Sequence, residues 1–256
     1  MSSPRAAIFD LDNTLAMAFE PLSPRTAQGV SRLLERVPVA IMSGAAFERM
    51  EKNILPELPA GTKLEDLYLF PDTAARCYVY EKSKWERVYD HKFTNKLYER
   101  IVAALEEGIE KTSICKGAPS WGERILAREN QVTFAGLGVD APGDKKVAWD
   151  PDRSKRTILK KYLDEHLSGL PVDIRISSRT AIDITQSGVN KAEGVNWLAA
   201  HLNIAPRDML FVGDDLGPGG NDAMVIPTGI QTRQVSGPEE TAKIIEEMIS
   251  TPVSHN

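Results

Sequence analysis

Two aspartates one residue apart, Asp10 and Asp12, stand where the apolar run of residues 6–9 ends. Near the other end of the chain, Asp214 and Asp215 follow a similar apolar run. Ligands of an open parallel sheet bind outside the carboxyl ends of its strands, so carboxylates just past two such strands can converge in space. Magnesium suits this place because it takes oxygen ligands from one or two carboxylates, together with waters and phosphate oxygens. The pattern predicts a magnesium-dependent phosphoryl-transfer site in which Asp10, Asp12 and Asp214 hold the metal.

The first motif, Asp10-x-Asp12-x-Thr14, carries residue types that can perform the reaction. A carboxylate such as Asp10 can attack phosphorus and form an aspartyl-phosphate. Asp12 lies on the same side of a locally extended chain, so it can protonate the leaving oxygen, and its backbone carbonyl can ligate the metal. Thr14 is expected to support these groups. The alternative is a polar strand-to-loop turn in which Asp and Asn side chains cap backbone amides.

The second acidic motif is a glycine-rich loop, residues 213–222, after the apolar run 209–212. Asp214 can reach the metal, while Asp215 and Asp222 can bind its waters or orient neighbouring groups. Asn221 is a candidate for binding phosphate. The alternative is a glycine-proline turn with solvated acidic side chains.

Two further segments could bind phosphate. Ser43 and Gly44 follow a predicted strand and can donate a hydroxyl and backbone amides at a helix N-terminus. Lys191 opens a predicted helix and can neutralise both the phosphate and the attacking carboxylate. A helix-capping serine and a solvated surface lysine are the alternatives. The order of all four segments favours a site, because each stands past a strand or opens a helix.

Short β-rich runs that alternate with helical patterns predict an α/β fold with a doubly wound parallel sheet. Predicted strands include residues 37–42, 67–71 and 229–232, with a hairpin formed by 77–80 and 85–89 and a helix over 45–55. From about residue 91 the pattern becomes α-β-β-α-β-β, which predicts an inserted α+β cap domain. We therefore expect a catalytic core of residues 1–90 and 188–256 and a cap of residues 91–187.

The composition limits the partners and the compartment. The 256 residues carry a formal net charge of −5, which argues against a nucleic-acid surface. Cys77 and Cys115 are far apart and outside any CxxC pattern, so a reducing, cytoplasmic setting is expected. The first residues form no apolar signal segment, and no apolar run approaches the length of a membrane span. The expected partner is a small phosphorylated metabolite; the oligomeric state is left open, a homodimer included.

With these motifs the chain resembles the haloacid dehalogenase-like phosphatase superfamily, whose four motifs match residues 10–14, Ser43, Lys191 and 214–222. The inserted block occupies the position of that superfamily's type IIB cap. The chain is most similar to eukaryotic-type phosphomannomutases, in residues 42–44, 211–214 and 218–222 and in Asp183 followed by Asn190-Lys191. The resemblance implies a magnesium-dependent enzyme that works through an aspartyl-phosphate.

The chain also departs from the mutase pattern. That family carries an arginine shortly after the nucleophile motif and another in an Ile-Gly-Arg cap segment, where this chain reads residues 16–21 and Leu137-Gly138-Val139. A mutase must hold a bisphosphorylated hexose by either end, so it needs a firm distal phosphate clamp, which arginine supplies best. A simple phosphatase can work with a weaker distal phosphate clamp. The remaining cap candidates are Arg128, which fits the family's cap-arginine position, and Arg179 with Asp183, unless these side chains are only solvated.

The expected activity is hydrolysis of a phosphorylated metabolite, a sugar phosphate by preference, and the alternative within enzymes is a hexose-phosphate mutase. A phosphoaspartate signalling module also combines an acidic pair, Ser/Thr and Lys, but its length and motif order differ from those of this chain. A non-catalytic binding protein on the same scaffold is a further alternative, because fold does not determine function.

Overall fold

The computed structural model describes residues 3–251 of the chain. These residues form two compact units: unit 1 contains residues up to Asp90 and from Asn190 onward, and unit 2 is His91–Val189. The sequence analysis drew the second boundary at 187/188.

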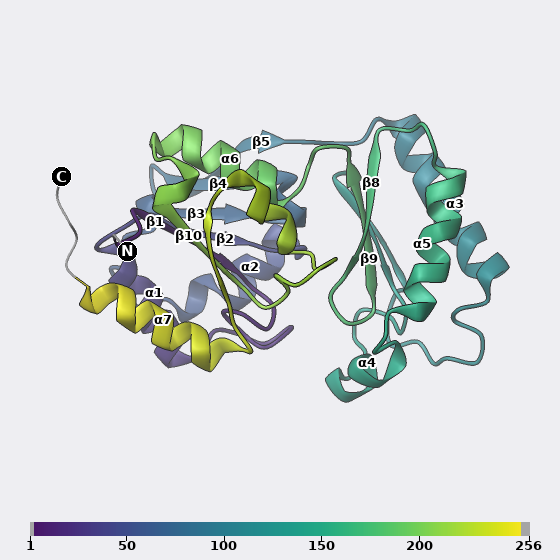
Figure 1. Ribbon diagram of the computed structural model, residues 1–256, viewed down its shortest axis with the longest axis horizontal. Coiled ribbons are helices and arrows are strands. Elements are labelled where there is room, and N and C mark those ends of the chain that lie inside the picture. Colours follow the sequence, from purple (N-terminus) through teal and green to yellow (C-terminus); the bar gives the residue numbers. More distant parts are fainter. Residues whose placement is uncertain (1–2, 252–256) are drawn as a thin grey trace. The chain divides into compact units, whose positions relative to one another are not determined.

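Unit 1 is built on a seven-stranded sheet in the order β11-β10-β1-β2-β3-β4-β5 (Figure 1). Its strands are β1 (Ala6–Asp10), β2 (Val39–Met42), β3 (Leu67–Phe70), β4 (Arg76–Glu81), β5 (Lys84–Asp90), β10 (Met209–Gly213) and β11 (Gln231–Gln234). The strands from β11 to β3 run parallel, and β4 and β5 add an antiparallel hairpin at one edge. The predicted α/β core is therefore confirmed.

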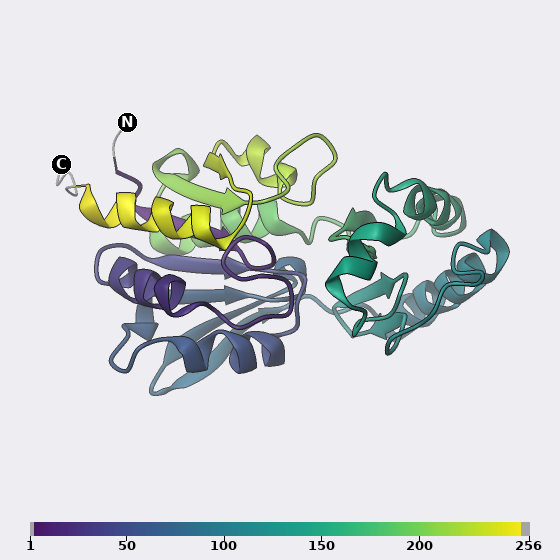
Figure 2. The ribbon, with the colours of Figure 1, turned by 90° about the horizontal axis from the view of Figure 1, so that it is seen from below.

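Helices cover both faces of this sheet (Figure 2). They are α1 (Pro24–Leu34), α2 (Phe47–Asn53), α6 (Lys191–Leu202) and α7 (Pro238–Ser250). Successive residues of a strand point to opposite faces. Phe9 of β1 accordingly packs with Val30 of α1 and Ile245 of α7, while Ile8 packs with Val195 of α6. Because β1 is buried on both faces, its sequence is continuously apolar up to Asp10.

Two predicted strands in unit 1 begin two residues too early, while the boundaries of the other predicted strands differ by at most one residue. The strand expected from residue 37 begins at Val39, because the Val37 N–H still donates to the end of α1, at Leu33, and Pro38 has no N–H. The strand expected over 229–232 is β11, two residues later. Gly229, with φ +81°, ends the preceding 3-10 turn and so cannot begin the strand.

Unit 2 has a four-stranded antiparallel sheet in the order β6-β7-β9-β8. Its elements are β6 (Ile125–Ala127), β7 (Gln131–Ala135), β8 (Val172–Ser177), β9 (Ala181–Gln186), α3 (Asn95–Thr112), α4 (Gly143–Trp149) and α5 (Ser154–His166). Phe134 and Ile182 pack against Ile101 of α3 and Leu159 of α5, so one face of the sheet is covered by helices. Helix α4 was not predicted, because it begins with glycine and a charged run that hides apolar periodicity.

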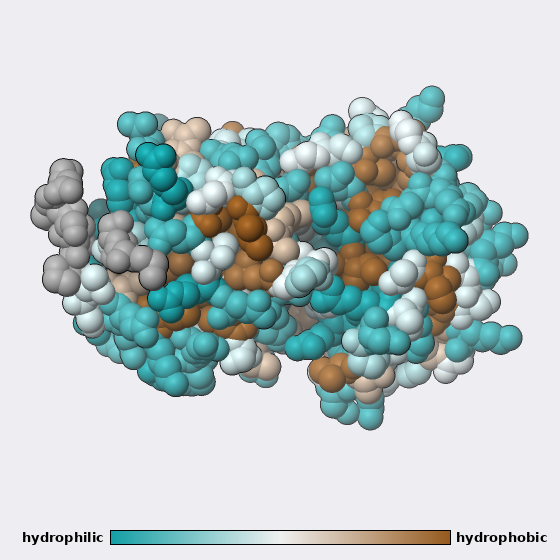
Figure 3. Space-filling view, in the orientation of Figure 1, coloured by the Kyte–Doolittle hydropathy of each residue, from teal (hydrophilic) through white to brown (hydrophobic). Residues whose placement is uncertain are grey.

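The apolar surface is divided into small patches by polar side chains on the face drawn in Figure 3. The large apolar side chains that are exposed come from many elements: Met17, Phe19, Val88, Val147, Ile158, Leu170 and Ile226. Scattered residues of this kind are normal on protein surfaces. Within residues 3–251, no helix has both the length and the apolar character that crossing a bilayer requires.

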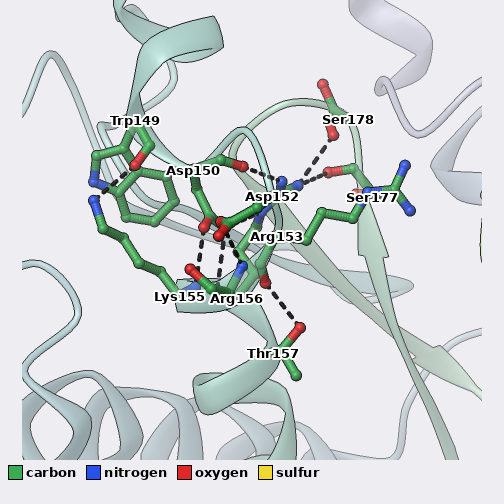
Figure 4. Close-up of polar contacts among 10 residues, drawn as sticks. Trp149, Asp150, Asp152, Arg153, Lys155, Arg156, Thr157, Ser177 and Ser178 are labelled. Atoms are coloured by element: carbon green, nitrogen blue, oxygen red, sulfur yellow. Dashed lines mark hydrogen bonds and ion pairs between the residues drawn. The ribbon is translucent and has the colours of Figure 1, made fainter.

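A buried ion pair between Asp150 and Arg156 lies at the start of α5, next to the β8–β9 turn (Figure 4). The side chains of Arg156 and Asp150 are 2% and 0% exposed. Arg156 Nε donates to Asp150 Oδ2 at 2.7 Å, and its Nη1 donates to the carbonyls of Ser177 and Ser178, each at 3.0 Å. The Asp150 carboxylate also accepts from the backbone N–H of Lys155, at the start of α5. Both buried charges are thus fully compensated, which is the condition under which such a pair is tolerated.

Arg156→Met should destabilise the protein by about 3–5 kcal/mol, because the Asp150 carboxylate would stay buried without its partner. Lys160→Met is the matched control on the same helix. It breaks an exposed pair with Asp164 and should cost less than about 1 kcal/mol. Urea denaturation measures both free energies of unfolding, and equal losses would contradict the assigned importance of the buried pair.

Candidate active site

Parallel strand pairing brings three chain-distant segments to one edge of the unit 1 sheet. Asp10, the last residue of β1, pairs with Met42 of β2, so Ser43 comes directly after its neighbour. On the other side Phe9 pairs with Val212 of β10, which continues into Gly213 and Asp214. The carboxyl ends of three adjacent strands therefore carry the predicted residues.

Lys191 is a buried ammonium group between two carboxylates. Its side chain is 1% exposed, and Nζ donates to Asp10 Oδ1 at 2.5 Å and to Asp222 Oδ1 at 2.6 Å. Lys191 is the first residue of α6, whose N-terminus is capped by Asn190: its Oδ1 accepts from two backbone N–H groups of the first turn. A buried charge needs such partners. The start of α6 is thereby tied to the end of β1.

Three carboxylates form a cluster at this edge. Asp10, Asp214 and Asp222 each offer an oxygen, and these oxygens lie within 4.8 Å of one another. The oxygens of Asp222 already accept from Lys191 and from the Asp215 N–H. The hard oxygen donors of Asp10 and Asp214 fit magnesium. The sequence analysis gave Asp222 a supporting position, whereas the structure brings its carboxylate into the cluster itself.

Burial and mutual repulsion change the proton affinity of these groups. Burial raises the pKa of Asp10 well above its ordinary value, and Asp222 adds to this effect although Lys191 opposes it. Burial also raises the pKa of Asp214 to about 6, again with a contribution from Asp222. Burial alone would lower the pKa of Lys191, but Asp10 and Asp222 outweigh it and raise that pKa. Three carboxylates facing one ammonium lack positive charge, which is what a divalent cation would provide.

The loop after β10 is closed by its own hydrogen bonds. The Asp215 N–H donates to Asp222 Oδ2 at 3.2 Å, and the Asn221 N–H donates to Asp215 Oδ2 at 3.1 Å. Gly213 is required here, because a Cβ at this position would lie 2.3 Å from Asp222 Oδ2. Asp215 therefore shapes the loop, and it turns the Asp222 carboxylate toward Lys191.

Ser43 is held by a turn of unusual backbone geometry. Its side chain is buried, its Oγ accepts from the Ala45 N–H at 3.0 Å, and its carbonyl accepts from the Thr73 N–H at 2.8 Å. The three residues Asp72–Ala74 all have positive φ, +51°, +57° and +64°, a region that costs energy for residues other than glycine. Ser43 keeps its hydroxyl hydrogen for donation, and Gly44 follows it ahead of α2.

Asp12 lies outside the acidic cluster. Its carboxylate accepts from both terminal nitrogens of Arg49, a residue that the sequence analysis missed. Phe19, also missed, places its ring 4.4 Å from the Arg49 guanidinium carbon. The signal that could have found Arg49 is its position on the helix that directly follows Ser43-Gly44. Thr14 is fully buried, and its Oγ1 has no hydrogen-bond partner among residues 3–251.

The three cap candidates lie in unit 2, and the structure does not bring all of them together. Asp183 is central in the sheet, where its Oδ1 accepts from Gln131 Nε2 at 2.9 Å and from Thr133 Oγ1 at 2.7 Å. Arg128 is in the β6–β7 turn, and the exposed Arg179 is in the β8–β9 turn. Because β7 and β9 are antiparallel, these two turns are at opposite ends of the sheet.

Comparison with known proteins shows which class the chain resembles. A family model described as haloacid dehalogenase-like hydrolase matches residues 142–223, which contain Lys191, Asp214 and Asp222. Together with relatives that align over nearly the whole chain, this match makes the chain similar to the haloacid dehalogenase-like hydrolases. These similarities support an enzyme of the phosphatase and phosphomannomutase type.

The similarity to phosphomannomutases extends over nearly the whole chain. A probable phosphomannomutase of Caenorhabditis elegans is 23% identical over 265 residues, covering 97% of this chain and 98% of that protein. A phosphomannomutase of Galdieria sulphuraria is 23% identical over 258 residues, covering 95% and 94%. The resemblance predicted from the motifs is confirmed.

Solved structures show the same fold at low identity. IMP-bound Plasmodium falciparum IMP-nucleotidase superposes with a TM-score of 0.72 at 17% identity, covering 97% of this chain and 69% of that one. The C-terminal domain of Candida albicans trehalose-6-phosphate phosphatase gives 0.67 at 17% identity, covering 97% and 93%. A haloacid dehalogenase-like hydrolase of Bacteroides thetaiotaomicron gives 0.64 at 14% identity, covering 96% and 99%.

Magnesium should stabilise the protein in a pH-dependent way. Burial raises the pKa of Asp214 from 3.8 to about 6. Between these two pH values the metal-free folded state binds more protons than the unfolded state. Its free energy of unfolding therefore falls as the pH rises through this range. Magnesium binds the ionised carboxylates, so its stabilising effect should be present at about pH 8 and decline below about pH 6. Thermal unfolding with and without magnesium measures this effect.

Asp214→Asn should abolish most of the magnesium effect. Asp164→Asn, which removes an exposed carboxylate of unit 2, should leave the effect unchanged. A melting temperature of the unsubstituted protein that ignores magnesium at both pH values would contradict the metal assignment.

Proposed function

We propose that the protein is a magnesium-dependent phosphatase that hydrolyses a small phosphorylated metabolite, a sugar phosphate by preference, through an aspartyl-phosphate on Asp10. The observation that carries the proposal is the buried contact of Lys191 with Asp10 and Asp222 beside Asp214. This arrangement holds a carboxylate at a strand end next to a fixed positive charge. Phosphoryl transfer needs just these two things, positioning and charge stabilisation.

In the first step Asp10 attacks the phosphorus atom. Its Oδ1 is engaged by Lys191, so Oδ2 is the oxygen that forms the new bond. The bond from phosphorus to the ester oxygen breaks, and Asp12 gives its proton to that oxygen as the alcohol leaves. Ser43, the Gly44 amide and Asn221 would bind phosphoryl oxygens, with Lys191 balancing their charge. Magnesium, held by Asp10, Asp214 and the Asp12 carbonyl, would supply further positive charge against the repulsion between the carboxylate and the phosphate.

In the second step Asp12, now ionised, takes a proton from water, and the oxygen of that water attacks phosphorus. The bond to Asp10 breaks, inorganic phosphate leaves, and the Asp10 carboxylate is restored. Thr14 and Asp215 support the first motif and the loop after β10, and Asp222 holds Lys191.

Unit 2 is proposed to act as a type IIB cap that selects the substrate, with residues 91–187 as its expected extent. Asp183 lies on the sheet face not covered by α3 and α5, among hydroxyl and amide groups that suit a sugar. Arg128, in the turn next to β7, is the better arginine candidate, and Arg179 is the alternative. Both cysteines, Cys77 and Cys115, are buried free thiols, in keeping with the proposed cytoplasmic location.

Asp10→Asn should lower turnover by about 10⁴-fold or more, because the amide is nearly isosteric but a poor nucleophile. Released phosphate from a panel of phosphorylated metabolites is the assay, with acid-quenched mass spectrometry to detect the phosphorylated peptide. Asp66→Asn is the control and should keep full activity, because Asp66 precedes the amino end of β3 whereas the site lies at the carboxyl ends of the strands. A phosphate adduct elsewhere in the chain, or persistent turnover in Asp10→Asn, would refute the assigned nucleophile.

A hexose-phosphate mutase is the second candidate, favoured by the two phosphomannomutase relatives. Val139 stands where that family has the arginine of its Ile-Gly-Arg segment. The nearby Lys146 is buried, and its Nζ donates to the Val139 carbonyl at 2.9 Å. A side chain engaged in this way does not replace a distal phosphate clamp, so the phosphatase remains the preferred function.

Mannose 1-phosphate with a hexose bisphosphate activator separates the two activities. We expect inorganic phosphate to accumulate faster than mannose 6-phosphate, because the chain lacks both arginines of the mutase pattern. The two products are quantified together by phosphorus NMR. Predominant mannose 6-phosphate would make the enzyme a mutase.

A further inference from the structure

The Asp12 carboxylate is held by a guanidinium fork. Arg49 Nη1 donates to Asp12 Oδ2 at 2.9 Å, and Nη2 donates to Oδ1. The side chains are 18% exposed for Arg49 and 25% for Asp12, so the pair is partly screened from water. Bidentate contacts of this kind are both strong and directional.

Phe19 and Asn53 hold Arg49 and the loop after the first motif in place. The Phe19 ring packs on the guanidinium, and its backbone N–H points to Asp12 Oδ1 at 3.4 Å. Asn53 Nδ2 donates to the Phe19 carbonyl at 3.2 Å, which ties this loop to α2. Phe19 has φ +70°, which is uncommon for a bulky residue, and it is half exposed. An exposed aromatic residue in a costly conformation beside a reactive carboxylate points to a functional arrangement.

The pair restricts the access of other groups to the Asp12 carboxylate. An ionised carboxylate only accepts hydrogen bonds, whereas a carboxyl group that gives up a proton must carry hydrogen on one oxygen. Both oxygens of Asp12 face donors of Arg49. Opening at least one of these contacts would give a leaving group better access to an Asp12 oxygen.

The guanidinium has unused donor capacity when it leaves Asp12. Its Nε is buried and has no hydrogen-bond partner among the residues that the structure describes. A half-buried positive charge that loses its carboxylate needs another anion, and planar guanidinium groups match phosphate oxygens well. A phosphate monoester positioned for attack by Asp10, with its leaving oxygen at Asp12, presents such an anion.

We propose that Arg49 is a substrate-binding residue that passes from Asp12 to an oxygen of the substrate's phosphate group, and that this exchange frees Asp12 for proton transfer. The inference rests on the proposed function through the role of Asp12. It adds a phosphate ligand from α2 to those from the strand ends. In the enzyme without substrate, Asp12 stays paired with Arg49. When an anionic ester binds, it draws Arg49 away and so frees Asp12 to act as the proton donor.

Inorganic phosphate is the probe, titrated by calorimetry into the full chain at a fixed magnesium concentration. The proteins are the unsubstituted enzyme, Arg49→Met, Asp12→Asn and the double variant, with Arg32→Met as the control for loss of an exposed arginine. Arg49→Met should weaken phosphate binding on the order of tenfold, the scale of one lost charged hydrogen bond. Arg32→Met should leave the affinity unchanged.

The decisive quantity is how much Asp12→Asn tightens phosphate binding in each background. If Arg49 must leave Asp12 to reach phosphate, Asp12→Asn tightens phosphate binding more when Arg49 is present than when methionine replaces it. If Arg49 only neutralises Asp12, the tightening is equal in both backgrounds or larger with methionine, which would overturn the exchange. No phosphate binding to the unsubstituted enzyme would also overturn it. Arg49→Lys keeps the charge but loses the fork, so its phosphate affinity should lie between those of the unsubstituted enzyme and Arg49→Met. This variant replaces Arg49→Met in the comparison if the methionine variant folds poorly.

These measurements need no turnover, so the two proposals can fail separately. A positive result in the binding experiment without any phosphate adduct on Asp10 would reject the proposed phosphatase and keep Arg49 as a phosphate ligand. An Asp10 adduct with equal tightening in both backgrounds would reject the exchange alone.

Discussion

A single buried ammonium group holds the candidate site together. Lys191 has almost no exposure, and its charge is balanced by Asp10 and Asp222. A carboxylate so deeply buried would otherwise favour its neutral form, which cannot attack phosphorus. The contact therefore stabilises the fold and also favours the ionised form of the proposed nucleophile, against the effect of burial. The same contact joins β1, α6 and the loop after β10, which are the three segments that the reaction needs.

The two aspartates of the first motif have different surroundings, and this difference matches their different tasks. Asp10 ends a fully buried strand and faces Lys191, while Asp12, two residues later, lies nearer the surface and faces Arg49. One carboxylate is kept fixed for attack. The other is held by a partner that an incoming anion can compete for. The division follows from where the strand ends, because the extended chain buries Asp10 and releases Asp12 into a loop.

Local patterns predicted most of the fold and the strand ends that carry Asp10, Ser43 and Asp214. What the sequence did not predict depends on contacts between distant residues. Arg49 meets Asp12 across 37 positions of the chain, and no local pattern links them. The carboxylate of Asp222 enters the cluster only because the loop folds back on Gly213. Helix α4 was missed because its short charged sequence has no apolar periodicity, and the roles of the site residues stay predictions.

The insertion of unit 2 between β5 and α6 also has a consequence for the order of assembly during synthesis. β1 is synthesised before unit 2, whereas its neighbour β10 and its counter-ion Lys191 follow only after the whole of His91–Val189 has been made. Unit 2 is contiguous and can close its own core in the meantime, since domains generally fold as units. Until then Asp10 has no counter-ion to be buried with, so the central sheet cannot be completed before the last quarter of the chain is available.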